Sequence, residues 1–108
     1  MNQNPLEKSP ERIPTKVEVM EIISRFVENP TISRELSDAQ GLYLLEAEIK
    51  GQEQGEIIEY QYMRKGMHGK NQARETGICV TSYKDGVPEH SEMVLVYNPE
   101  SNQWKDVR

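Results

Sequence analysis

Apolar residues recur at helical spacing only near the start of the chain. Between residues 15 and 28 they form one stripe, with charged residues on the opposite side. Thr15 can cap the first turn, and Glu18 three residues later completes the pattern of a capping box. Asn29 and Pro30 then stop the helix. The pattern predicts one amphipathic helix with this buried stripe: Val19, Met20, Ile23, Phe26 and Val27.

From residue 41 onward the hydrophobic period changes to two, which is typical of half-buried strands. A glycine-flanked turn at 51–55 and the hairpin signature Asp85-Gly86 separate the alternating stretches. We therefore expect an α+β domain in which the helix packs on a curved antiparallel sheet of four or five strands in meander order. The expected strands are 41–50, a second one after the turn, 76–84, one that runs to Tyr97, and a short one at 104–107. On the sheet, the stripe is expected to contact Tyr43, Leu45, Tyr60, Ile78, Met93 and Leu95.

Two segments fall outside this pattern. Residues 1–14 hold three prolines among polar residues, which predicts a flexible tail ahead of a single domain at 15–108. Residues 31–40 fit either a short second helix, anchored by Leu36 and Ala39, or a covering loop. The layout is similar to that of cystatin-like folds, but the turn at 51–55 lacks the valine of the cystatin inhibitory hairpin, so no function follows from the similarity.

The length, net charge and cysteine content of the chain limit the classes of protein to which it can belong. At 108 residues the chain has room for one core, and its formal charge of −5 disfavours nucleic acid and anionic membranes as partners. A lone cysteine, Cys79, allows no internal disulfide, and neither a signal peptide nor a long apolar run is present. These features favour a cytoplasmic protein with a protein partner, without a cofactor and without a membrane role.

The hairpin at Asp85-Gly86 yields a testable strand register. A two-residue loop pairs Lys84 with Val87, and each earlier residue with a later one. With this register, one face of the hairpin is apolar and the other carries polar side chains. The expected pairs are Ile78 with Met93, Thr76 with Leu95, Cys79 with Glu92, and Thr81 with His90.

This register brings Cys79, His90 and Glu92 into one neighbourhood. A thiol, an imidazole and a carboxylate are the parts of an activated nucleophile or a metal site. No oxyanion-binding loop accompanies them in the sequence, and diagonal neighbours on a sheet lie about 7–8 Å apart. We therefore interpret Cys79 as a small, weakly polar filler and expect no catalytic or metal site.

Charged residues cluster in two further places. Aligning Ile49 with Ile58 places Glu48 opposite Glu59 on the outer face beside Glu46, which we interpret as a solvated acidic face. The segment from 60 to 74 has no acidic residue, and Gly66 and Gly69 keep it flexible. It could bind an anion through its basic side chains. These candidates are Arg64, Lys65, His68, Lys70 and Arg74.

Apolar residues also remain on the strand faces that the core does not use. Left in water they would form a patch of the kind that marks a protein interface. Residues 31–40, the tail or a second subunit could cover them. We expect a non-catalytic interaction domain that acts through this outer sheet face, as an adaptor, inhibitor or small chaperone or as a homodimer; the alternative is a module for a small anionic or phosphate-bearing ligand. The expected interface is Leu44, Ile57, Met63, Val94 and Val96.

Overall fold

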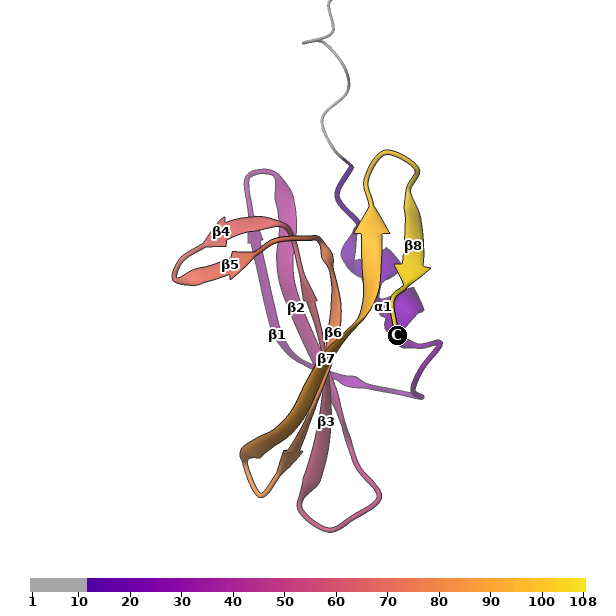
Figure 1. Ribbon diagram of the computed structural model, residues 1–108, viewed down its shortest axis with the longest axis vertical. Coiled ribbons are helices and arrows are strands. Elements are labelled where there is room, and N and C mark those ends of the chain that lie inside the picture. Colours follow the sequence, from indigo (N-terminus) through magenta and orange to yellow (C-terminus); the bar gives the residue numbers. More distant parts are fainter. Residues whose placement is uncertain (1–11) are drawn as a thin grey trace, which may run out of the picture.

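The computed structural model describes residues 12–108, apart from the side chain of Asn71. Residues 1–11 of the tail expected at 1–14 lie outside the described residues. The next three residues are packed against the domain: Arg12 is hydrogen-bonded, Ile13 is half-buried and Pro14 is fully buried. One short helix lies on an antiparallel sheet, and a small hairpin projects from the other side of that sheet (Figure 1). The elements are α1 Lys16–Ile23, β1 Thr31–Asp38, β2 Gly41–Lys50, β3 Glu56–Met63, β4 Gly66–His68, β5 Asn71–Ala73, β6 Gly77–Lys84, β7 Val87–Asn98 and β8 Gln103–Asp106.

The main sheet has six strands in the order β1-β2-β3-β6-β7-β8, and every neighbouring pair is antiparallel. This is the expected α+β plan in meander order, with one strand more than expected. The additional strand is β1, at the edge of the sheet. Strands β4 and β5 form a separate two-stranded sheet, inserted between β3 and β6.

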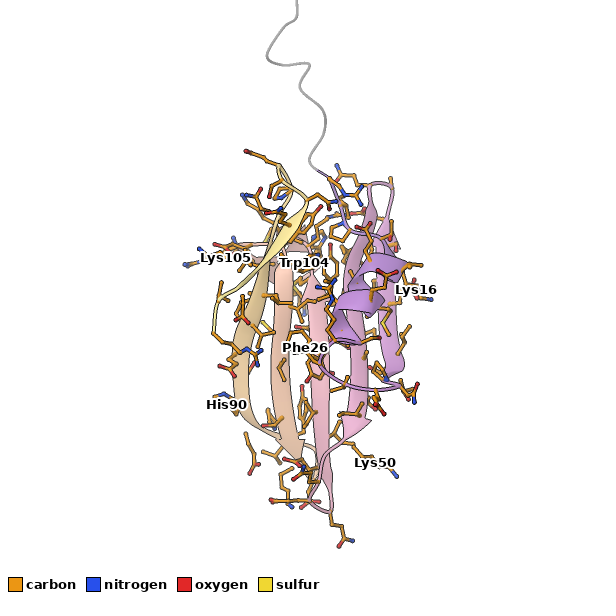
Figure 2. The ribbon with its side chains drawn as sticks, turned by 90° about the vertical axis from the view of Figure 1, so that its right-hand side faces the viewer. Lys16, Phe26, Lys50, His90, Trp104 and Lys105 are labelled. Atoms are coloured by element: carbon orange, nitrogen blue, oxygen red, sulfur yellow. The ribbon has the colours of Figure 1, made fainter. Side chains whose placement is uncertain are left out.

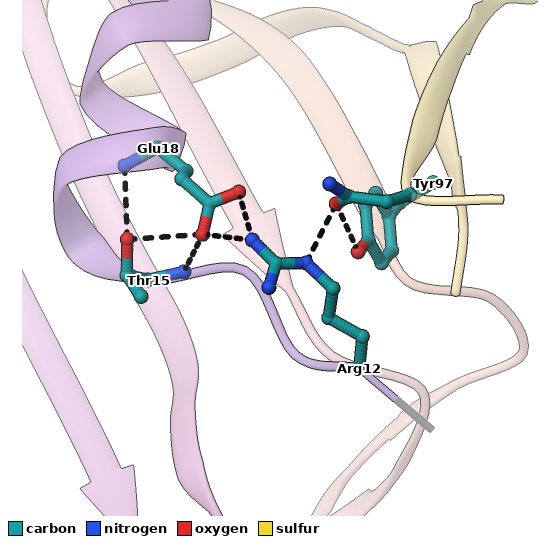
Figure 3. Close-up of polar contacts among 5 residues, drawn as sticks. Arg12, Thr15, Glu18 and Tyr97 are labelled. Atoms are coloured by element: carbon teal, nitrogen blue, oxygen red, sulfur yellow. Dashed lines mark hydrogen bonds and ion pairs between the residues drawn. The ribbon is translucent and has the colours of Figure 1, made fainter. Parts of the chain in front are cut away.

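The start of α1 follows the sequence closely. Thr15 Oγ1 accepts a hydrogen bond from the Glu18 backbone N–H, and the Glu18 carboxylate accepts one from the Thr15 N–H, each at 3.2 Å. Arg12 Nη2 donates to both Glu18 carboxylate oxygens at 2.7 Å, while its Nε donates to Asn102 (Figure 3). The Tyr97 hydroxyl donates to the same Asn102 oxygen. The capping box is thus tied to the β7–β8 turn.

The helix ends earlier than expected. Regular helix stops at Ile23, and tighter backbone bonds from Arg25 to Ile22 and from Phe26 to Ile23 form the next turn. This turn brings the Phe26 ring to 5.8 Å from the Tyr60 ring, so part of the expected stripe contacts the sheet from a turn rather than from the helix. Ile22, which the sequence pattern placed outside the stripe, is buried as well.

Two β-bulges decide which side chains enter the core. In β2 the pairing with β1 shifts at Tyr43, and in β7 the pairing with β6 shifts at Val94. Leu42 and Val94 consequently join the core, whereas Tyr43 and Met93, both expected there, do not. A single inserted residue reverses the face of a side chain because the strand period is two.

The core lies between α1 and the face of the sheet that we call the inner face, which Figure 2 shows from the helix side. Phe26 extends from the helix turn to the middle of this face, and Trp104 of β8 packs against the same core nearer the β7–β8 turn. The Trp104 ring is 5.0 Å from the Tyr97 ring and 6.4 Å from the Tyr62 ring. The opposite side of the sheet is called the outer face below.

Residues 31–38, for which we expected a helix or a loop, form the edge strand β1. All but Leu36 are exposed, so the segment has no apolar period that could have revealed a strand. Backbone pairing with β2 holds it in place. Charged side chains such as Arg34 and Glu35 protect the free edge from pairing with another chain.

Candidate functional site

The outer face is open except at one end. There the β4–β5 hairpin leaves the sheet on the side opposite α1 and overhangs the face (Figure 1). A cavity of about 320 Å³ lies beneath it, which we call the outer cleft. Its floor comes from β3, β6 and β7, and its wall from the hairpin and the chain that follows it. The floor is Met63, Gly77, Cys79 and Met93, and the wall includes Gln72, Ala73 and Arg74.

Gly77 permits the sulfur-rich floor of the outer cleft. A Cβ atom at this position would lie 2.4 Å from the Leu95 carbonyl oxygen and 3.0 Å from the Met93 sulfur. Without that atom, the Met93 side chain can cross Gly77 and bring its sulfur to 3.9 Å from Cys79 Sγ. Met63 lines the same cavity. Flexible, polarisable methionine side chains suit a surface that adapts to a binding partner.

An acidic cluster adjoins the outer cleft on β2 and β3. Glu48 and Glu59 are direct cross-strand partners, and Glu46 lies on the same face, hydrogen-bonded to Gln61. Burial is the main cause that raises the pKa of Glu59, and Glu46 and Glu48 raise it further. A hydrogen bond from the Tyr83 hydroxyl and, to a smaller extent, the charge of Arg34 lower the Glu59 pKa without reversing its rise. The pair of glutamates expected from the sequence is therefore present, in a negative local potential.

The structure places some of the residues expected at the interface on the outer face and others elsewhere. Ile57 and Met63 lie half-buried on the outer face, and Leu44 beside Met63 is almost fully buried. The assignment of Val94 to this face was wrong, because the β7 bulge turns it into the core. Val96 pairs with Gly77 and so lies on the outer face as expected, where it also lines a groove at the end of the sheet. Sequence reasoning missed Met93, because a regular hairpin register assigns it to the core.

The expected neighbourhood of Cys79, His90 and Glu92 is not assembled. The two-residue turn is present, with positive φ at Asp85 and Gly86 and Lys84 opposite Val87. The register then shifts twice, so Cys79 pairs with Met93, Val80 with Glu92, and Ser82 with His90. His90 and Glu92 therefore share the inner face, and Cys79 is on the outer face. Burial raises the pKa of the Cys79 thiol, which disfavours the nucleophilic thiolate.

The basic segment is a hairpin rather than a loop, and two of its five candidate anion ligands have other partners. Arg64 is almost fully buried, and its guanidinium forms a bidentate ion pair with Asp38, with Nη1 donating to Oδ1 at 3.0 Å. The His68 ring stacks on Tyr43 at 4.5 Å. Lys65, Lys70 and Arg74 are exposed and form no ion pair within residues 12–108.

The Arg64–Asp38 pair predicts a loss of stability in acid. Hydrogen bonds from Arg64 are the main cause that holds the pKa of Asp38 well below its usual range. A carboxylate whose pKa is lowered by folding stabilises the protein above its unfolded pKa of about 3.9, and this stabilisation is lost as the pH falls further. Urea titrations at pH 5 and pH 3 should show a smaller pH dependence of unfolding free energy for Asp38→Asn than for wild type. The exposed Asp106→Asn is the control and should retain the wild-type dependence.

A second groove, of about 670 Å³, lies at the end of the sheet beside the β7–β8 turn. Lys65 and Arg74 line it together with Lys105, which lies far from them in the sequence. Glu75 and Glu100 line it too, so its charge is mixed. We call it the end groove.

The described residues hold neither a metal-ligand cluster built from His, Cys, Asp and Glu nor a membrane-spanning helix. No group of three or more His, Cys, Asp or Glu side chains in the described part of the chain could hold a metal ion. Within the same residues no helix is long and apolar enough to cross a membrane. Comparison of the chain with protein-family models, with curated proteins and with solved structures finds no match.

Proposed function

We propose that the protein is a non-catalytic interaction domain that binds another protein chain through its outer face. The observation that carries this proposal is the outer cleft, an overhung cavity with a methionine-rich floor beside an acidic cluster. Concave shape and exposed apolar area are what recognition of a partner requires. A partner surface with apolar side chains and a basic rim would complement it.

The proposal is tested by photo-crosslinking from the outer face. A photoreactive amino acid replaces Met93, which is 37% exposed on the floor of the cleft. The matched control carries the same group at Val17, which is 65% exposed on α1 and belongs to the other side of the sheet. Irradiation in the cells that make the protein should yield a discrete protein adduct from position 93. Equal labelling from both positions, or no adduct from position 93, would contradict an interaction site in the cleft.

A second candidate function is binding of a small anionic or phosphate-bearing ligand in the end groove. The observation in its favour is that Lys65, Arg74 and Lys105 line one cavity without ion-pair partners among the described residues. Calorimetric titration with inorganic phosphate tests it. Replacing Lys65 and Lys105 by Gln should abolish binding, whereas Lys16→Gln on α1 should leave it unchanged. Equal affinity in all three proteins would remove this candidate.

A further inference from the structure

Three sulfur-bearing side chains line the floor of the outer cleft. The chain has five methionines and one cysteine, and three of these six residues, Met63, Cys79 and Met93, line this one cavity. The Cys79 Sγ and Met93 Sδ atoms are 3.9 Å apart. The Met93 sulfur also lies 3.0 Å from the point where a Cβ atom of Gly77 would be, so it sits above the backbone of that glycine. Because Gly77 is the direct cross-strand neighbour of Met63, the third side chain starts beside the other two.

The distance between the two sulfur atoms is that of two ligands on one metal ion. A metal–thiolate bond is about 2.3 Å long in zinc sites, and sulfur ligands at that distance are about 3.8 Å apart in a tetrahedral site and about 4.0 Å apart in a trigonal one. The observed 3.9 Å between Cys79 and Met93 lies between these values. Methionine is unbranched and has three rotatable bonds, so Met63 can supply a third sulfur ligand from the neighbouring strand.

The donor atoms favour a soft metal ion. Thiolate and thioether ligands select Cu(I), whereas Zn²⁺ sites use cysteine, histidine and carboxylate, and Ca²⁺ and Mg²⁺ sites use oxygen. One thiolate and two neutral thioethers carry a single negative charge, so a monovalent ion leaves the partly buried site neutral. Among the described residues that line the cleft there is no histidine, and the one carboxylate, Glu75, is exposed on the wall beside Arg74.

We propose that the outer cleft binds one Cu(I) ion through Met63, Cys79 and Met93. The ion displaces the proton of the Cys79 thiol, so binding releases one proton and transfers no electron. The overhanging β4–β5 hairpin restricts the access of water to the sulfur atoms (Figure 1). This site goes beyond the proposed function and does not depend on it. The ligand set differs from Cys79 with His90 and Glu92, and the alternation of apolar residues hides it because a regular hairpin register places Met93 in the core.

Competition with the coloured Cu(I) chelator bathocuproine disulfonate tests the site in the intact, reduced protein without oxygen. We expect one ion per chain. Met63→Leu and Met93→Leu should each weaken Cu(I) binding roughly tenfold or more, because even residues behind a ligand contribute about 10–100-fold, and Cys79→Ser should abolish it. Leucine keeps the apolar volume of methionine, so the fold should persist in both leucine variants, as circular dichroism will show.

The matched control for these variants is Met67→Leu. Met67 is 66% exposed on the β4–β5 hairpin and does not line the cleft, so its replacement should leave Cu(I) affinity unchanged. Nuclear magnetic resonance of protein labelled at the methionine methyl groups identifies the ligands directly. One equivalent of Cu(I) should shift the methyl signals of Met63 and Met93 and leave those of Met20 and Met67 in place.

The outcomes separate the sulfur site from simpler explanations. Wild-type affinity in both cleft leucine variants, with loss only in Cys79→Ser, would show binding to a solitary thiol and would overturn the proposal. Half an ion per chain would overturn it too, because Cys79 would then bridge two copies, and so would equal affinity for Zn²⁺ in the same assay. The crosslinking variant at position 93 lacks one of the three ligands, so it tests the proposed interaction site without the metal, and either proposal can fail alone.

Discussion

Tyr62→Ala is expected to lower the free energy of unfolding by about 3–5 kcal/mol, whereas Tyr62→Phe is expected to leave it unchanged or to raise it. Tyr62 is completely buried at the centre of the inner face, with Trp104 packed edge-on against it. Removing the ring opens a large cavity in the core. Its hydroxyl, by contrast, makes no hydrogen bond to any described protein group, so removal of the oxygen breaks no such bond.

Urea denaturation monitored by circular dichroism measures both substitutions at Tyr62. The alanine effect would be a large share of the roughly 5–15 kcal/mol that stabilises a typical domain. A loss above about 1 kcal/mol in Tyr62→Phe would show that the hydroxyl has a partner, since that is the net value of an ordinary hydrogen bond. A small loss in Tyr62→Ala would contradict the packing of this part of the core.

Ile23→Ala is expected to cost about 2–5 kcal/mol, because Ile23 is completely buried between the end of α1 and the sheet. A helix of eight residues is too short to be stable alone, so α1 depends on this packing. The matched control is Val17→Ala in the same helix. Val17 is mostly exposed, and alanine is the better helix former, so its change should be close to zero.

The same denaturation series tests whether α1 stabilises the domain through its packing on the sheet and not through its helical conformation alone. Both substitutions alter the helix, but only Ile23→Ala removes contacts with the sheet. Equal unfolding free energies for the two variants would show that α1 is not anchored by its buried side. A native baseline without helical signal in Ile23→Ala would show that the helix has detached while the sheet persists.

The candidate interaction surface could be predicted only in part. Ile57 and Met63 are on the outer face as expected, because β2 and β3 pair without a bulge and keep the register of Glu48 opposite Glu59. Met93 and Val94 exchange their expected roles, because the bulge in β7 is not visible in the alternation of apolar residues. The overhanging hairpin was also missed, since its two strands are only three residues long.

Local interactions are what the sequence determined by itself. The capping box at Thr15 and Glu18, the turn at Asp85-Gly86 and the strand 41–50 depend on residues close together in the chain, and all three are present in the structure. These features can be read from spacing, because the groups that stabilise them are near neighbours.

The tertiary structure decided the rest. Strand β1 lacks an apolar period and exists through its backbone pairing with β2, while Arg64 is removed from the basic surface by Asp38, which is 26 positions away. The bulges in β2 and β7 determine which of two adjacent apolar residues is buried. Which of the two residues is buried depends on contacts between segments that are distant in the sequence. The free energy of those contacts depends on three-dimensional packing, which cannot be read from the order of residues along one strand.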